Sequence, residues 1–196
     1  MRTLSGTALI AFAIAALSLP VGAADEKTEP GYTSLFNGKD LTGWKVDWSK
    51  QKKEKKDNEV LDGKTEAVSG RFKVAEGAIA IDPKAKGDIY IETTKKFDKD
   101  VSIKFDYNPA AKCNNDLFIR GVKFDIKDAK AYPESDVKNI KLDEWNKFEI
   151  IVKGNEVEFK NNGESLKKFP AKGAAGPFTL RAEGGAIQYK NLQYKE

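Results

Sequence analysis

The side chains available for chemistry in this chain are carboxylates, ammonium groups and guanidinium groups, because histidine is absent and cysteine occurs once, at Cys113. A nucleophilic serine or cysteine is commonly activated by a histidine base, so Ser–His and Cys–His catalysis are excluded. Histidine-ligated zinc sites are excluded with them. A single thiol also cannot form an internal disulfide. Proton transfer by carboxylates and charge stabilisation by Lys or Arg remain.

Charged residues recur at every second position of several apolar segments, the pattern of strands with one buried and one exposed face. The members of this exposed-face set are Lys104, Asp106, Lys123, Asp125, Arg181 and Glu183. Where their strands are neighbours, we expect Lys123 to pair with Glu183 and Asp125 with Arg181 across a cleft. Ordinary surface ion pairing, worth about 0–1 kcal/mol per pair, is the other interpretation.

Amides and an indole add possible sugar contacts. The polar segment Asn114-Asn115-Asp116 suits sugar hydroxyls or a calcium ion, although a plain turn is the simpler interpretation. Trp48 stands beside a charged segment, so we expect its ring to be exposed as a stacking platform for sugar rings. Trp44 and Trp145 belong to two of the sequence blocks that carry the family resemblance described below, and we expect both in the core.

The elements that must position these groups are strands. From Phe72 onward, short alternating segments separated by turn residues predict an all-β sandwich of two antiparallel sheets with little helix. Phe72–Val74 and Ala78–Ile81, which flank Glu76-Gly77, predict a hairpin. Lys45–Val68 is charged and weakly periodic, so we expect a long loop that holds one short helix at most. Its lysine-dense run, Lys50–Lys56, predicts a solvated loop.

The N-terminal residues 1–24 have the pattern of a secretory signal. Arg2 is basic, Ala8–Leu19 is apolar but too short to span a bilayer, and small residues favour cleavage near Ala23 or Ala24. An N-terminal anchor is the alternative. We expect a linker over 25–31, one domain over 32–196, location in the periplasm or outside the cell, and no membrane insertion after cleavage.

The formal charge of +4 comes from lysines interleaved with acids, which does not predict a nucleic-acid partner. The sequence makes no prediction of oligomeric state.

Three ordered blocks point to a family. They are Leu35–Trp44 (LFNGKDLTGW), Glu144-Trp145-Asn146 with the following Ile150–Asn155 and Asn161–Gly163, and Gly176–Leu180 with Ile187–Leu192. Together they resemble the 3-keto-disaccharide hydrolase family, over Tyr32 to the C-terminus. The resemblance implies a concanavalin A-like lectin/glucanase-type jelly-roll β-sandwich. It also implies an exported carbohydrate-active protein that hydrolyses 3-keto-glycosides.

The polar positions of that family pattern are altered here. Where the family has glutamate and glutamine after its FFR-like segment, this chain has Lys123 and Asp125. Where the family's closing segment has glutamine and histidine, this chain has Arg181 and Glu183. A non-catalytic carbohydrate- or polymer-binding sandwich and a structural envelope protein are therefore the alternative functions.

A ketone at C3 acidifies the C2 hydrogen, so a 3-keto-glycoside can be cleaved by elimination, with a base near C2 and a donor near the ketone oxygen. Ordinary glycoside hydrolysis instead needs two carboxyl groups about 5–5.5 Å or 6.5–9.5 Å apart. The candidate catalytic residues are Glu183 and Asp125 as bases and Lys123 as donor. The candidate substrate-binding residues are Arg120, Arg181, Asp106, Asn114, Asn115 and Trp48. No metal and no cofactor is predicted, and the expected partner is a carbohydrate.

Overall fold

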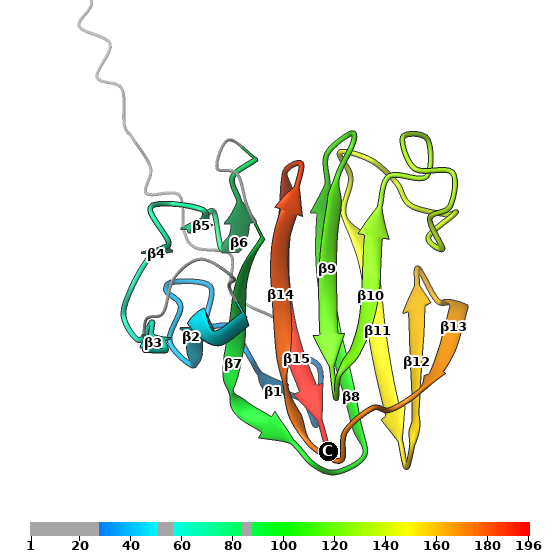
Figure 1. Ribbon diagram of the computed structural model, residues 1–196, viewed down its shortest axis with the longest axis horizontal. Coiled ribbons are helices and arrows are strands. Elements are labelled where there is room, and N and C mark those ends of the chain that lie inside the picture. Colours follow the sequence, from blue (N-terminus) through cyan, green and yellow to red (C-terminus); the bar gives the residue numbers. More distant parts are fainter. Residues whose placement is uncertain (1–27, 51–56, 84–87) are drawn as a thin grey trace, which may run out of the picture.

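The computed structural model describes residues 28–50, 57–83 and 88–196. Two antiparallel sheets pack face to face, one in front of the other in Figure 1. The expected signal segment and most of the lysine-dense run Lys50–Lys56 lie outside the described residues. Within the described part, no helix is long and apolar enough to cross a bilayer.

The six-stranded sheet has the strand order β10 (Val122–Lys127), β9 (Asn114–Ile119), β14 (Gly176–Gly184), β7 (Ile89–Phe97), β2 (Trp44–Val46), β3 (Glu59–Val60). The nine-stranded sheet has the order β13 (Glu164–Pro170), β12 (Glu156–Asn161), β11 (Asn146–Lys153), β8 (Val101–Pro109), β15 (Ile187–Lys195), β6 (Ala78–Ile81), β5 (Phe72–Ala75), β4 (Glu66–Ala67), and β1 (Thr33–Ser34) pairs with β15. One short 3-10 turn, η1 (Trp48–Lys50), is the helical element among the described residues. The predicted all-β sandwich with two antiparallel sheets is confirmed.

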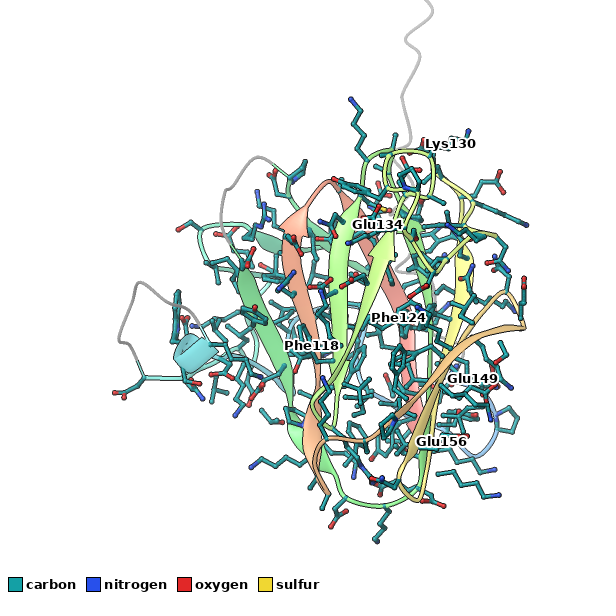
Figure 2. All side chains as sticks on the ribbon, turned by 45° about the vertical axis from the view of Figure 1, so that its right-hand side comes forward. Phe118, Phe124, Lys130, Glu134, Glu149 and Glu156 are labelled. Atoms are coloured by element: carbon teal, nitrogen blue, oxygen red, sulfur yellow. The ribbon has the colours of Figure 1, made fainter. Side chains whose placement is uncertain are left out.

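Period-two alternation places one face of each long strand in a shared core. Along β8 and β10 every second residue is buried, as expected for half-buried strands. Phe124 on β10 reaches the opposite sheet, where its ring stacks on that of Phe159 with centroids 4.5 Å apart and also contacts Phe148 (Figure 2). The polar partners of these core residues consequently project from the two outer faces.

The turn at Asn37-Gly38 is held by the side chain of Asn37. The Asn37 Oδ1 atom accepts hydrogen bonds from the backbone amides of Lys39 and Asp40 at 2.8 and 2.9 Å. The turn brings Leu35 beside Trp44, whose indole Nε1 donates to the Leu35 carbonyl at 2.8 Å. Trp44 is fully buried, as the sequence predicted.

Two expectations were wrong. Lys45–Val68 is not one loop, because it contains β3 and β4 and most of β2 in addition to η1. The segment is fixed by Val46 and Leu61, which are buried in the core. Trp145 is not a core residue, since 39% of it is exposed and Lys190 lies over its ring, with the ammonium nitrogen 3.8 Å from the ring centroid.

Candidate functional site

A row of polar side chains crosses the outer face of the six-stranded sheet. Asp125 on β10 is in register with Asp116 on β9, and Asp116 is in register with Arg181 on β14. Arg181 is in turn paired with Tyr90 on β7. Residues paired across neighbouring strands point to the same side of a sheet. Four strands, of which β7 and β14 are distant in sequence from the β9–β10 hairpin, therefore place these groups side by side.

Ion pairs extend this row into a cluster. The Lys123 ammonium lies 2.5 Å from the Asp125 carboxylate and 3.8 Å from that of Asp116. The Arg181 guanidinium contacts the carboxylates of both Asp116 and Glu183. We call Asp116, Lys123, Asp125, Arg181 and Glu183 the polar cluster. The expected pairs Lys123–Glu183 and Asp125–Arg181 are not formed, because Asp116 lies between the two cations and pairs with each.

Asp116 is the functional candidate that the sequence analysis missed. Its side chain has no solvent exposure, whereas those of Glu183 and Asp125 are 32% and 31% exposed. Burial and the neighbouring Asp125 carboxyl raise the pKa of Asp116 to about 7. Burial alone would raise the pKa of Asp125 as well, but the hydrogen bond with Asp116 and the Lys123 ammonium lower it to about 2. The pair therefore holds one proton below about pH 7, on Asp116, and at pH 7 Asp116 is about half ionised.

This proton gives a testable pH dependence of stability. Between about pH 4 and pH 7 the folded chain keeps a proton on Asp116 that the unfolded chain has released, so the contribution of Asp116 to stability falls as the pH rises. Asp116→Asn abolishes this titration. We expect urea unfolding to show wild type losing stability relative to the variant by up to about 1.4 kcal/mol per pH unit across this window.

The pKa of Asp125 is lowered rather than raised, so its effect on stability falls below this pH window. The contribution of Asp125 to the stability of the folded protein is lost as the pH falls from about 4 towards 2. The control is Asp98→Asn, which changes an exposed aspartate just after β7, at the opposite end of that strand from Tyr90. Its profile should run parallel to that of wild type. A parallel profile for Asp116→Asn would instead show that Asp116 is ionised throughout the range.

Two amides support the end of β14 next to the cluster. Asn114 donates to the Glu183 carboxylate at 3.0 Å. Asn115 is fully buried and points to the other side, where it donates to the Gly184 carbonyl at 3.0 Å and accepts from the Glu183 backbone amide at 3.1 Å. Gly185 has φ +72°, and a Cβ atom there would lie 2.7 Å from Cys113 Cα, so the chain must have glycine at this point.

Buried polar atoms that lack a hydrogen-bond partner in the protein lie in the cluster and beside it. Among the described residues these include Asn114 Oδ1 and Arg181 Nε. Buried polar atoms are normally paired with protein or water, so unpaired atoms gathered beside partly exposed carboxylates indicate a place where a polar ligand or water completes the bonding. The groups present suit sugar hydroxyls and a carbonyl oxygen.

The structure brings together Lys123, Asp125, Arg181, Glu183 and Asn114, but the other predicted binding residues lie elsewhere. Asp106 is on β8, on the outer face of the opposite sheet. Arg120 is buried in the turn between β9 and β10, and its guanidinium donates to the backbone carbonyls of Phe97 and Gly154, each at 3.3 Å. A guanidinium held by main-chain carbonyls is a structural support rather than a ligand contact.

The expected exposure of Trp48 was also wrong. Its ring is only 8% exposed and belongs to the hydrophobic core below η1. The burial of the large apolar area of an indole outweighs the charge of the neighbouring segment.

The thiol of Cys113 is fully buried, and burial raises its pKa to about 12. At neutral pH it therefore lacks the thiolate form that a nucleophile needs.

A family model described as a 3-keto-alpha-glucoside-1,2-lyase-like domain matches residues 31–195. No curated protein gives a significant match to the sequence. A candidate glycosyl hydrolase from Parabacteroides distasonis ATCC 8503 has a similar structure at 21% identity and TM-score 0.61, over 84% of this chain and 93% of that chain. A second candidate glycosyl hydrolase from that organism matches at 12% identity and TM-score 0.59, over 84% and 98% of the two chains.

A β-glucanase from Bacillus licheniformis is also similar, at 7% identity and TM-score 0.52, over 84% of this chain and 97% of the other. At these identities the structural likeness identifies the fold, a concanavalin-like jelly roll, and the matched family model covers nearly the whole described domain.

Proposed function

Because the chain belongs to the 3-keto-alpha-glucoside-1,2-lyase-like domain family, we propose that it is a carbohydrate-active protein that cleaves 3-keto-glycosides at the polar cluster. Family membership supports a carbohydrate-related function. The observation that carries the site is the convergence of Lys123, Arg181 and Glu183 with Asp116 and Asp125 on one sheet face. Fold alone would not select this activity, since function depends on the groups at the site.

The proposed reaction is elimination followed by addition of water. Glu183 removes the proton from C2, the electron pair forms the C1–C2 double bond by way of the C3 enolate, and the bond from C1 to the glycosidic oxygen breaks. The leaving oxygen takes up the proton from Glu183, which restores the carboxylate. Water then adds its hydroxyl to C1 and a proton returns to C2. Lys123 and Arg181 are the cations positioned to stabilise the enolate oxygen.

Glu183 is the stronger candidate base of the two exposed carboxylates. The lowered pKa of Asp125, about 2, makes its carboxylate a weak acceptor of protons near neutral pH. Asp116 has no exposed surface from which to reach a substrate, so we assign it a positioning role through its contacts with Arg181 and Lys123. Incubation of the mature protein with a panel of 3-keto-disaccharides, followed by product analysis, tests the assignment.

A non-catalytic sugar-binding module is the second candidate, because each cation of the cluster already has a carboxylate partner. Lys123 pairs with Asp125, and Arg181 pairs with Asp116 and Glu183. Ion pairing of this kind orients polar groups for hydroxyl contacts but occupies the donors that an enolate needs. Binding of a glycan without release of any product from the panel would favour this function.

We further propose that the protein acts in the periplasm or outside the cell after removal of its first residues. The basic start, short apolar run and small residues before Asp25 support this proposal. N-terminal sequencing of protein from the native host should begin at Ala24 or Asp25. Cell-associated protein that keeps Met1 would contradict it.

A further inference from the structure

A cavity of about 440 Å³ lies on the outer face of the nine-stranded sheet, across the sandwich from the polar cluster. Strands β8, β11 and β12 supply most of its charged lining, and Asn191 on β15 completes it. In Figure 2, Glu149 from this lining lies on the other side of the sandwich from Phe118 of β9. The volume falls within the range of small-molecule sites, about 300–1,000 Å³.

The carboxylates of the cavity already have partners. Asn191 donates to the Asp106 carboxylate at 2.6 Å from a β-bulge of β15, where its φ is +54°. Glu149 accepts from the Ser102 hydroxyl at 3.0 Å. At the rim, Glu29 pairs with the Lys104 ammonium at 2.7 Å. Asp106 and Glu149 keep their charges but accept hydrogen bonds from neutral donors of the protein, and Glu29 is in an ion pair.

The remaining lysines of the cavity are unpaired. Lys147 and Lys160 both line it, and neither ammonium group has a carboxylate within 4 Å in the part of the chain that the structure describes. Lys147 is in register with Asp106, and Lys160 with Glu149, yet those acids bond elsewhere. Because these two ammonium groups make no ion pair among the described residues, their charged donors are free to contact an acidic group of a ligand.

An exposed aromatic ring lies on the same face. Trp145 precedes β11 by one residue and points to the same side as Lys147, because alternate residues of an extended chain share a face. The ring is 39% exposed and is fixed by Lys190. Exposed indoles stack on the C–H faces of sugar rings, so the aromatic and the cations together suit a sugar that bears a negative charge.

We propose that this cavity is a binding site for acidic saccharides, in which Lys147 and Lys160 contact a ring carboxylate and Trp145 stacks on an adjoining sugar. The site is separate from the polar cluster and does not depend on the proposed cleavage activity. Lys147 and Lys160 come from strands and Trp145 directly precedes β11, so the site is largely formed before a ligand arrives.

Calorimetric titration of the whole protein with trigalacturonate tests the proposal, beside the neutral trisaccharide in which each carboxylate is a primary alcohol. We expect the acidic ligand alone to bind, with an affinity that falls as salt is added. The double variant Lys147→Gln/Lys160→Gln should weaken binding by about tenfold or more, since charge-assisted contacts are lost. Trp145→Ala should weaken it as well.

Lys153→Gln is the matched control, because Lys153 lies on the same strand and face about 20 Å away and loses the same charge. Glu183→Gln is the second control and separates the two sites. Both should bind trigalacturonate like wild type. Equal binding of the neutral trisaccharide, absence of binding by wild type, or unchanged binding by the double variant would each overturn the proposal, whatever the outcome for cleavage at Glu183.

Discussion

Glu183→Gln is expected to lower the turnover of a 3-keto-disaccharide by about 10²–10⁴-fold while the protein stays folded. The amide keeps the shape of the side chain and can still accept the hydrogen bond that Asn114 donates at 3.0 Å. It cannot take up the C2 proton. Arg181 keeps its contact with Asp116, so the strand geometry should persist. Turnover is measured by quantifying released sugar, and folding by circular dichroism and thermal unfolding.

Two further variants sharpen this result. Glu156→Gln removes the same charge from an exposed pair on β12 and should leave turnover unchanged. Asp125→Asn should reduce turnover less than Glu183→Gln, because Asp125 acts through its neighbours. If wild type cleaves a keto-sugar and Glu183→Gln does not slow it, the assignment of Glu183 as the base is wrong.

Phe124→Ala is expected to cost about 3–5 kcal/mol of unfolding free energy. The ring is 2% exposed and stacks on Phe159 of the opposite sheet, so its removal leaves a cavity that the neighbouring rings Phe148 and Phe159 cannot close. Urea unfolding at constant pH measures the loss. An ordinary domain has an unfolding free energy of about 5–15 kcal/mol, so a loss of this size removes a large part of the stability.

Lys123→Ala is the matched variant one residue earlier on the same strand. Lys123 is 42% exposed and makes ion pairs rather than core contacts, so its loss should cost less than about 1 kcal/mol. The two variants together test the alternation that defines the faces of β10. Similar losses for both would contradict the strand assignment.

The fold was predictable from the sequence to the extent that alternation reports burial. The hairpin β5–β6 and the faces of β8 and β10 follow from residue types alone. The two tryptophan errors have the same physical origin. Trp48 was placed by its charged sequence neighbours and Trp145 by the family block that contains it, whereas the exposure of each ring depends on segments distant in the chain.

The site was predictable only in part. Alternation selected Lys123 and Glu183, but it does not say which strands are neighbours, so it grouped Asp106 with residues of the other sheet. Asp116 was not proposed as a site residue, because the polar segment that contains it was interpreted as a turn. The available signal was the hairpin about Arg120-Gly121, since counting outward from that turn places Asp116 opposite Asp125.

Incubating a 3-keto-disaccharide with the protein in D₂O tests the proposed elimination most directly. Loss of the C2 proton to Glu183 and its return from solvent predict a deuterium at C2 of the released 3-keto sugar, detected by NMR or mass spectrometry in early product. Glu183→Gln and a sample without protein measure uncatalysed exchange. Released sugar that retains hydrogen at C2 would contradict the account, because the glycosidic bond would then break without removal of that proton.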